Sequence, residues 1–335
     1  MTSRVFTKFQ YGKESTRGTA VAATKMLLAA PKAIPQDRTP VFIEDALGVR
    51  SRAVRSAIYQ YLAEDTLSIP DGYFQALPMF FSCGLKGNIT ATETTGGQGD
   101  YLWTFLPSMT SANAPDTLTL EMGDDTQAYE IEYLFFKRYK IAFQVAQGAD
   151  SSPVSIEADY TGRQVSTSTF TGALSIPTVT TMNGKLARLY KDTTWANRGT
   201  TELTSVLRGG EIEIITGVHP KFFGDGNQYF STHGESWIEA MLTLDLERSA
   251  AADTLWDEMR ALTAKAYSIK INGPQIGSGT SYNLTFNLWG MPEQAVPLNA
   301  EDQGNNIDRF LIHGMYDTTG ANVLEVKVTT NAATI

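Results

Sequence analysis

The feature that most constrains the fold is a pattern of secondary structure that occurs twice in the chain. Around residues 55–101, and again around residues 236–289, a stretch with two-residue hydrophobic alternation leads into a short amphipathic helical stretch and then into two more alternating stretches. A period of two is typical of a strand with one buried face, and a spacing of three to four is typical of a helix. The sequence therefore predicts a β-rich module with one short helix, present in two copies.

The composition is that of a large globular chain rich in strand formers. At 335 residues the chain is long enough for two domains of ordinary size. Apolar residues make up 42% of the chain and charged residues 19%, which excludes a disordered or collagen-like protein. Because Thr, Val, Ile, Tyr and Phe are plentiful and turn-forming residues recur at short intervals, we expect mainly β structure.

Changes in composition divide the chain into four parts. Pro31, Pro35 and Pro40 prevent a continuous helix or central strand, so the first part is interpreted as an extended arm that docks elsewhere, with another subunit as the expected partner. The third part is rich in Thr, Ser and Gly and is interpreted as a linker. The predicted parts are an N-terminal arm (residues 1–50), a first β domain (residues 51–170), a linker (residues 171–205) and a second β domain (residues 206–335).

The first copy of the module combines strands with one short helix. Residues 54–62 alternate as a strand, and Phe74, Leu77 and Phe80 then fall at helical spacing, with Gly84 as the expected end of the helix. Pro78 limits this helix to a turn or two on either side. Residues 87–94 and 101–105 alternate again and predict a hairpin with a long Gly-rich loop.

A long strand is predicted after the first copy, over residues 128–145, preceded by a shorter strand over residues 117–122. A bend near Lys137 and Arg138 would let the long strand serve two sheets. Lys137, Arg138 and Lys140 lie beside aromatic residues, a mixture that nucleic-acid surfaces also use. We interpret the aromatic residues as core and the cations as partners of acidic neighbours.

The second copy has the more regular pattern. Residues 219–234 predict a projecting hairpin, and residues 237–246 a strand whose even-numbered positions form its core face. Residues 251–264 predict a helix with an apolar stripe of Leu255, Trp256, Met259 and Leu262, acidic residues near its start and Lys265 just after its end. Further strands are predicted over residues 211–216, 267–271, 282–289, 310–316 and 323–328.

The sequence contains no recognisable catalytic or metal-binding constellation. His219, His233 and His313 stand at no zinc-ligand spacing, and the single cysteine, Cys83, has apolar neighbours that indicate a buried thiol. Gly-x-Ser-x-Gly is absent, and neither Gly-Lys pair of the chain has the glycine that a phosphate loop requires. We therefore expect a protein that is not an enzyme and that needs no metal and no cofactor.

The charge and hydropathy exclude two further classes of protein. The formal net charge of −9 repels a nucleic-acid backbone, so no general phosphate-binding role follows. Nowhere do about 18 apolar residues run without interruption, and the N-terminus lacks the apolar core of a secretion signal. We expect a protein that is made in the cytosol and does not insert into a membrane.

Three segments resemble one protein family, the tail tube (major tail) proteins of long non-contractile bacteriophage tails. Residues 11–20, with Gly12, Glu14 and the run Gly18-Thr19-Ala20, look like the Gly-x-Glu-x-x-x-Gly-Thr-Ala start of such proteins. Residues 117–124 are similar to the strand and turn that follow the family's short helix. Residues 237–289, with their strand, helix and two strands, are similar to the family's tube domain.

The resemblance implies a fold, an assembly and a set of partners. The fold would be two tandem β-sandwich or barrel tube domains, each with a short flanking helix, and the function a structural virion protein that forms the conduit for DNA ejection into the host. Two tube domains per chain imply trimeric, pseudo-hexameric rings stacked into a tube. The implied partners are further copies of this chain, the tape measure, distal tail and tail terminator proteins, and double-stranded DNA as a non-specific passenger. The implied location is the virion tail, assembled in the bacterial cytoplasm.

The acidic balance of the chain is compatible with an acidic lumen that repels DNA phosphates over about one Debye length, roughly 8 Å. From strand alternation, the lumen-facing candidates are Glu130, Glu132, Glu239 and Asp245.

Three alternatives remain open at this stage. If the first copy is not a tube domain, a six-subunit ring with a decoration domain becomes the better arrangement. A carbohydrate-binding or adhesive β protein would use Trp and Tyr side chains as a sugar platform. A hydrolase could use the paired carboxylates Glu130 and Glu132.

Overall fold

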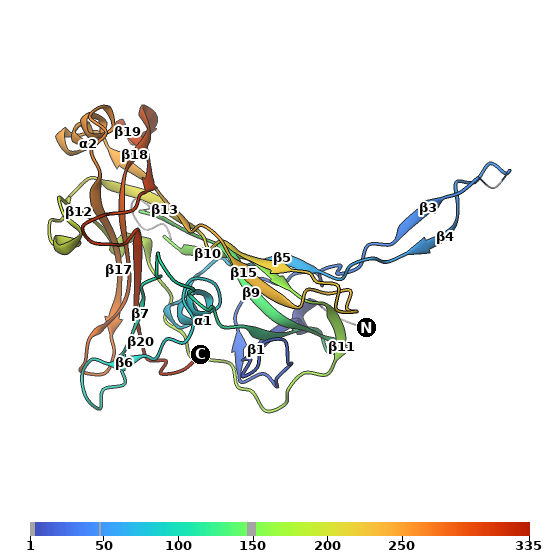
Figure 1. Ribbon diagram of the computed structural model, residues 1–335. Helices are drawn as coiled ribbons and strands as arrows, with labels where there is room; N and C mark the ends of the chain where they lie inside the picture. Colours follow the sequence, from blue (N-terminus) through green and yellow to red (C-terminus); the bar gives the residue numbers. More distant parts are fainter. Residues whose placement is uncertain (1–3, 47, 146–151) are drawn as a thin grey trace.

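Strands dominate the computed structural model, which describes residues 4–46, 48–145 and 152–335 (Figure 1). Two short α-helices accompany them in this part of the chain. All strand pairings among the described residues are antiparallel. The chain is thus mainly β, as the alternation predicted, and its packed layers are consistent with a β-sandwich.

The longest layer is a sheet that we call the polar-face sheet, because its outer side carries charged residues. Its strands pair consecutively in the order β5-β10-β9-β13-β16-β19-β18. Their bounds are β5 Ala63–Ile69, β9 Ala128–Gln144, β10 Val154–Gly162, β13 Leu207–Ile215, β16 Glu239–Glu247, β18 Ser281–Asp302 and β19 Asn305–Gly314.

Two further layers continue from the long strands of the polar-face sheet. One has the order β12-β17-β18-β20-β7-β6, with β6 Thr92–Glu93, β7 Tyr101–Phe105, β12 Ala187–Asp192, β17 Lys265–Gln275 and β20 Leu324–Thr330. In the other, β1 lies between β2 and β8, and β9 pairs with both β8 and β11, with β1 Lys8–Lys13, β2 Lys25–Leu27, β8 Leu118–Gly123 and β11 Val165–Ser168.

Strand β9 serves two sheets because it bends in its middle. Arg138 pairs with Asp159 and Phe136 with Tyr160, so Lys137 is the extra residue of a bulge. Up to Leu134 the strand pairs with β8 and β11, from Phe135 onward it pairs with β10, and from Arg138 onward it also pairs with β13. The predicted bend near Lys137 and Arg138 is confirmed. Strand β18 is shared in the same way, since residues 283–288 pair with β20 and residues 290–302 with β19.

The order of pairing around β9 is the same as the order around β18. β9 pairs with β8 and β11 in its first half and with β10 in its second half, and β10 in turn pairs with β5. β18 pairs with β17 and β20, then with β19, and β19 pairs with β16. β1 beside β8 corresponds to β12 beside β17. Strand β13 joins the two sets by pairing with both β9 and β16.

The structure differs from the prediction for the strands of the first copy. The strand predicted over residues 54–62 is replaced by β4 (Ala53–Ala57) and β5, which begins at Ala63. The predicted hairpin of residues 87–94 and 101–105 is reduced to β6 and β7, and β7 pairs with the C-terminal strand β20. The strands that correspond to β17 and β18 in their pairing are β8 and β9, and not the predicted strands of residues 87–94 and 101–105. Sequence alternation could not show this, because it does not specify the partner of a strand.

Each copy of the predicted module carries one α-helix. Helix α1 (Leu77–Ser82) follows the 3₁₀ turn η2 (Phe74–Ala76), and Pro78 occupies its first turn, where proline is tolerated. Helix α2 (Ala250–Arg260) begins at Ser249, whose side chain accepts the backbone N–H of Ala252. It ends earlier than predicted, and Leu262 of the predicted apolar stripe is exposed. The remaining 3₁₀ turns are η1 (Arg4–Phe6), η3 (Gly184–Leu186) and η4 (Trp195–Asn197).

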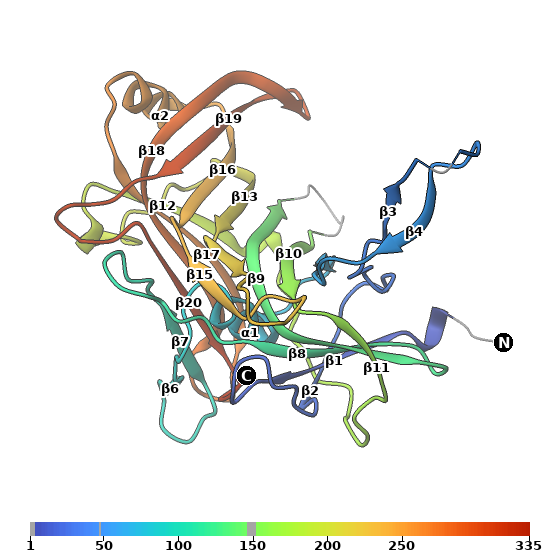
Figure 2. The same cartoon turned by 45° about the vertical axis from the view of Figure 1, so that its right-hand side comes forward.

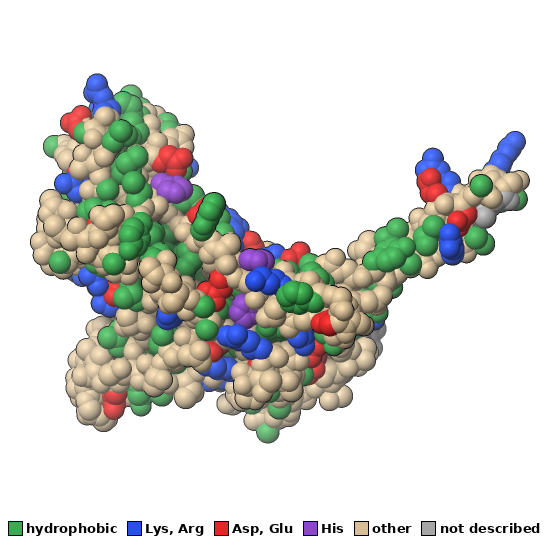
Figure 3. Space-filling model, in the orientation of Figure 1, with side chains coloured by type: hydrophobic (Ala, Val, Ile, Leu, Met, Phe, Trp, Pro, Cys, Tyr) green, Lys and Arg blue, Asp and Glu red, His purple; other side chains and the backbone are tan. Residues whose placement is uncertain are grey.

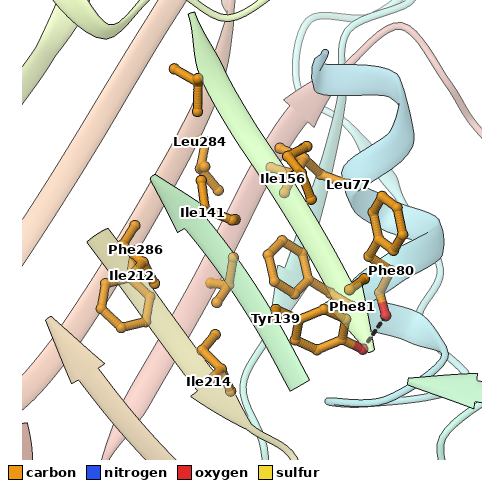
Figure 4. Packing of buried hydrophobic residues seen from close by; sticks show 14 of the residues in the cluster. Leu77, Phe80, Phe81, Tyr139, Ile141, Ile156, Ile212, Ile214, Leu284 and Phe286 are labelled. Atoms are coloured by element: carbon orange, nitrogen blue, oxygen red, sulfur yellow. Dashed lines mark hydrogen bonds between the residues drawn. The ribbon is translucent and has the colours of Figure 1, made fainter. Parts of the chain in front are cut away.

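The core lies between the inner side of the polar-face sheet and the other layers. In Figure 4, Phe80 and Phe81 of α1 point towards Tyr139 and Ile156, and the Tyr139 hydroxyl donates to the Phe80 carbonyl. On the other side, Ile212 and Ile214 of β13 lie opposite Leu284 and Phe286 of β18 (Figure 4). These residues are buried and belong to one continuous cluster that draws on both halves of the chain. Cys83 is also buried in it, as predicted.

The predicted arm and linker both contain core elements. Phe9 and Tyr11 of β1 are buried, and β1 pairs with β8, so the first part of residues 1–50 belongs to the body of the protein. Residues 171–205 contain β12, which pairs with β17 along its length. Their Gly- and Ser-rich composition obscured the short alternating stretch 187–192.

Two hairpins interrupt the polar-face sheet at corresponding places. Strands β3 (Val41–Glu44) and β4 precede β5, whereas β14 (Val218–Lys221) and β15 (Thr232–Glu235) precede β16. We call the first the projecting hairpin (residues 39–46 and 48–60) because it extends far from the body (Figure 2). The second, the folded hairpin (residues 218–235), packs against β9 through the buried Phe230. The predicted projection at residues 219–234 is thus wrong for that hairpin.

Candidate functional site: the polar sheet face and the projecting hairpin

Strands β13 and β16 of the polar-face sheet alternate between core and solvent positions. On β13 and β16 the core positions Ile212, Ile214, Leu242 and Leu244 are buried, and the residues between them lie on the outer side. The core face predicted for β16 is confirmed. Strand register and ion pairs place eight carboxylates and five cations of β5, β9, β10, β13, β16 and β19 on the outer side: Glu64, Glu157, Asp159, Glu211, Glu213, Glu239, Asp245 and Glu247, with Lys137, Arg138, Lys140, Arg208 and Arg309. The face is therefore net negative.

The cations of this face are held by carboxylates of neighbouring strands. Arg138 contacts Asp159 of β10 at 3.3 Å and donates to Glu213 of β13, and the hydrogen bond to Glu213 raises the pKa of Arg138. Lys137 pairs with Glu64 at 2.5 Å and Lys140 with Glu211 at 2.9 Å.

The basic cluster that the sequence singled out is therefore neutralised by its neighbours. The aromatic residues beside it, Tyr133, Phe135, Phe136 and Tyr139, are buried. The interpretation of this segment as core aromatics with paired cations is confirmed.

The four carboxylates singled out from the sequence lie in two different places. Glu239 and Asp245 lie on the outer side of the polar-face sheet, and Asp245 accepts two hydrogen bonds of 2.7 Å from Arg309. Glu130 and Glu132 precede the bulge of β9 and belong to the other sheet, where Glu130 lies opposite Glu121 of β8. The bulge separates the two pairs, because residues before and after it face different layers.

The surroundings of Glu130 and Glu132 disfavour their charged forms. Burial, together with the nearby carboxylate of Glu121, raises the pKa of Glu130. Burial also raises the pKa of Glu132, and the guanidinium of Arg163 acts in the opposite direction. Because Glu121 is only 2% exposed and accepts hydrogen bonds from Ala23 and Thr171, this patch is largely occupied by the protein's own donors.

Sequence reasoning missed most carboxylates of the polar face. Glu211 and Glu213 alternate with Ile212 and Ile214 in a segment that was predicted as a strand, so the same two-residue period could have placed them. For Glu157 and Asp159 the alternation is equally regular. The sequence could not show that these strands pair into one sheet.

The polar face is hollowed at one end. A depression of about 840 Å³ lies between β13, β16 and β19 and residues 299–302 of β18. Its charged lining includes Arg208, Glu211, Asp245, Asp302 and Arg309. Arg309 with Asp245 and Arg208 with Asp302 form ion pairs within it. Such paired charges form a polar surface.

Glu14 of the segment 11–20 fixes the neighbourhood of the β9 bend. Its carboxylate accepts the backbone N–H of Gly18 at 2.7 Å, the hydroxyl of Thr117 at 2.6 Å and the backbone N–H of Tyr133 at 2.7 Å. Tyr133 has φ +54°, a conformation that non-glycine residues adopt only when the surroundings hold them there. Glu14 thus links the N-terminal loop to the strained start of the bend.

Gly18 and Arg163 make a second connection from the same loop. Gly18 has φ +72°, and a Cβ atom on it would meet the Arg163 guanidinium. Arg163 donates to the carbonyl oxygens of Gly18 at 3.0 Å, Phe230 at 3.0 Å and Ser231 at 3.1 Å. The glycine of the motif is therefore required by close packing as well as by backbone conformation.

The projecting hairpin exposes apolar side chains without a core of its own. Val41, Phe42, Val54 and Tyr59 are all exposed, Phe42 to 70%. Apolar side chains gather along the hairpin and charged ones near its tip (Figure 3). Arg55 donates two hydrogen bonds, of 2.8 and 2.9 Å, to Asp45 across its strands. A two-stranded hairpin with exposed apolar residues is marginal in water by itself, which is typical of a segment that meets a partner.

The histidines contact different neighbours: His219 and His233 lie on the paired strands of the folded hairpin, and His313 lies on β19. His219 Nδ1 lies 3.1 Å from the Gly217 carbonyl, and His313 Nδ1 lies 3.1 Å from Glu293. His233 Nδ1 lies 3.3 Å from the Tyr133 hydroxyl, and burial, followed by the charge of Arg17, lowers the pKa of His233 to about 4. Within residues 4–46, 48–145 and 152–335, no group of three His, Cys, Asp or Glu side chains could hold a metal ion.

Comparisons with known protein families and with curated proteins find no match to this chain. In the described part of the chain, neither helix is long and apolar enough to cross a membrane.

Proposed function

We propose that this chain is a structural virion protein that polymerises into stacked rings and so forms the tail tube of a long-tailed bacteriophage. The observation that carries the proposal is the repeated order of strand pairing, joined through β13 into one antiparallel sheet with a single polar face. Such a chain supplies two neighbouring segments of a tube wall. The tube would be the conduit for DNA ejection into the host.

The finer description of the fold follows from the repeat. We assign one tube domain to β1, β5, α1 and β8–β11, and the second to β12, β16, α2 and β17–β20. Each is then a β-sandwich with one flanking helix. Three such chains make a ring with pseudo-sixfold symmetry, in place of six single-domain subunits.

The polar face is the proposed lining of the tube. Its opposite face is buried under the other layers, so only this side of the sheet is free to face a channel. Because carboxylates outnumber cations on it, the lining repels DNA phosphates within about one Debye length, roughly 8 Å at physiological salt. Glu239 and Asp245 fit this role. Glu130 and Glu132 belong to another sheet and are left out of the proposed lining.

The ends of the polar-face sheet are the proposed contacts within a ring. Strand β5 pairs with β10 on one side, and on its other side the backbone N–H of Ala30 donates to the Ser68 carbonyl and the Lys32 side chain to the Thr66 carbonyl. At the other end, the second half of β18 pairs with β19. Open edges of this kind pair with another chain unless they are covered. Closure of the sheet by three copies would remove both edges.

The projecting hairpin is the proposed contact between rings. Its exposed apolar residues need a surface to cover them, and the repeat of one chain along a tube offers a second copy at a fixed distance. The remaining proposed partners are the tape measure protein inside the tube during assembly and the distal tail and tail terminator proteins at its ends. The proposed location is the virion tail, after assembly in the host cytoplasm.

Negative-stain electron microscopy of the concentrated protein tests the proposal. Long hollow tubes or stacked rings are expected from the unchanged chain. Phe42→Asp should abolish tubes, because it places a charge in the proposed contact between rings. Ile176→Asp is the matched control, because Ile176 is also exposed but lies in the loop before β12. Dispersed monomers of the unchanged chain at high concentration would overturn the proposal.

A symmetry-determined image of one ring decides between the two proposed stoichiometries. Three chains per ring support the two-domain wall. Six chains per ring would mean that only one of the two sets of strands lines the channel.

One observation favours carbohydrate binding as a second candidate function. Trp237, two residues before β16, is 88% exposed, and exposed aromatic faces are used as platforms for sugars. A glycan array with the unchanged chain and with Trp237→Ala tests it. Binding that is lost in the variant supports the adhesive function, and absence of binding excludes it for the glycans on the array.

A further inference from the structure

The root of the projecting hairpin is closed by contacts between its two chain segments. The chain enters the hairpin at Asp37 and Arg38 and returns at Tyr61 and Leu62. The backbone N–H of Leu62 donates to the Asp37 carbonyl at 2.9 Å, and the Arg38 guanidinium lies 4.3 Å from the centre of the Tyr61 ring. These contacts keep the two segments together but do not fix the direction of the hairpin relative to the body.

One side of the root is tied to strand β11. The Asp37 carboxylate accepts the backbone N–H of Val165 at 2.9 Å. Val165 pairs in turn with Ile131 of β9. This contact holds the entering segment of the root against the body, while the returning segment continues into β5, which pairs with β10 from Ala63 onward.

The other side of the root is tied to the folded hairpin through Gln228. The carbonyl of Gln228 accepts the backbone N–H of Tyr61 at 2.9 Å, and its side-chain Nε2 donates to the Ile58 carbonyl at 2.8 Å. One residue thus binds the returning segment at two places, three residues apart. Two contacts along one chain segment fix a direction as well as a position.

The folded hairpin is itself firmly anchored, so it can transmit this restraint. Phe230 is buried, with its ring centre 5.0 Å from that of Tyr133 and 5.7 Å from that of Phe135. Arg163 donates to the carbonyl oxygens of Phe230 and Ser231 on the same segment. Gln228 therefore stands two residues from a buried anchor.

We propose that the folded hairpin is a strut for the projecting hairpin of the same chain and that Gln228 is its positioning residue. The strut and the projecting hairpin occupy corresponding places in the connectivity, before β16 and β5. In this arrangement only one of the two hairpins projects, because the other fixes its direction. The aim of the hairpin matters for assembly only if the proposed tube function holds, whereas the strut itself is a property of the single chain.

Spin-label distance measurement on the dilute monomer tests the strut. Labels are placed at Ser51→Cys in the projecting hairpin and Asp257→Cys on α2, and the buried Cys83 is left in place. A single narrow distance is expected in the otherwise unchanged chain. Gln228→Ala should broaden or shift the distribution, because loss of one hydrogen bond favours the displaced positions about five-fold.

The control is Gln275→Ala, whose side chain donates to the Gly279 carbonyl in the turn between β17 and β18. It should leave the distribution unchanged. If Gln228→Ala lowers the melting temperature, Gln228→Glu is used, since it keeps the size of the side chain and removes the donor. A distribution for the folded Gln228 variant that matches the unchanged chain would overturn the strut.

The same variants separate the strut from the tube proposal. A broadened distribution in Gln228→Ala supports the strut whether or not tubes form. Absence of tubes from the unchanged chain overturns the tube proposal alone. Where tubes do form, an increase in the concentration needed for assembly of Gln228→Ala, with none for Gln275→Ala, supports the role of the strut in assembly.

Discussion

The projecting and folded hairpins occupy corresponding positions in the chain but differ in what surrounds them. Each is inserted immediately before a strand of the polar-face sheet, β5 or β16. The folded hairpin buries Phe230 against Tyr133 and Phe135, whereas the projecting hairpin leaves Phe42 70% exposed. The place of a hairpin in the connectivity therefore does not determine whether the hairpin projects from the body. A hairpin projects when its apolar side chains have no surface of the body within reach.

Truncation of the central phenylalanine of each hairpin should give the largest difference. Phe230→Ala removes a fully buried ring and should lower the free energy of unfolding by about 3–5 kcal/mol. Phe42→Ala removes an exposed ring and should change it by no more than about 0.5 kcal/mol. Urea unfolding of both dilute variants measures the contrast. Equal losses would show that the projecting hairpin is packed in the monomer.

Two glycines with positive φ offer a second contrast. Gly18 (φ +72°) lies against Arg163, whereas Gly48 (φ +68°), in the projecting hairpin, has no atom within 4 Å of an added Cβ. Gly48→Ala should cost about 1 kcal/mol for the backbone conformation. Gly18→Ala should cost about 2–3 kcal/mol, because it also displaces Arg163 from its carbonyl partners. Thermal unfolding compares them, and a smaller loss for Gly18→Ala would contradict the packing described for that loop.

The folded hairpin should also confer a pH dependence. Burial holds the pKa of His233 at about 4, below the value of about 6.5 that an unfolded chain has. Between these values the unfolded chain binds more protons, so stability should fall as the pH is lowered from about 6.5 towards 4.

Replacement of His233 by Gln should reduce this fall. Melting temperatures measured between pH 7 and 4.5 test it. His313→Gln is the control, because His313 lies at the exposed end of β19 beside Glu293. A pH profile of His233→Gln that parallels the unchanged chain would count against the buried, neutral form of this histidine.

The smallest effect is expected for the ion pair on the projecting hairpin. Arg55→Gln removes the paired hydrogen bonds to Asp45, but both groups lie outside the core. Solvent screens such a pair, so the melting temperature should not change measurably. Amide hydrogen exchange of the hairpin should become faster while exchange of β9 stays constant. A lowered melting temperature would indicate that the hairpin is coupled to the core.

The sequence predicted those features that depend on local periodicity. The core face of β16, the length of β9 with its bend near Lys137 and the burial of Cys83 could be inferred from alternation and neighbouring residue types. The start of α2 could be inferred too, because Ser249 and Asp253 satisfy its first turn locally.

The strands of the first copy show where such prediction ends. Residues 101–105 were predicted as a strand and form β7, yet β7 pairs with β20, which follows more than two hundred residues later. Alternation marks the buried face of a strand without specifying its neighbour. For the same reason, Glu130 and Glu132 could not be separated from Glu239 and Asp245. That separation depends on which sheets the two halves of β9 join.

Local sequence alone therefore determined a mainly β chain with two short helices, because period and capping act over a few residues. The tertiary structure alone decided the strand order around β9 and β18, the extent of the polar face and which hairpin projects. These properties depend on contacts between residues far apart in the chain. Asp37 with Val165 and Gln228 with Ile58 are two such contacts, and neither leaves a trace in local periodicity.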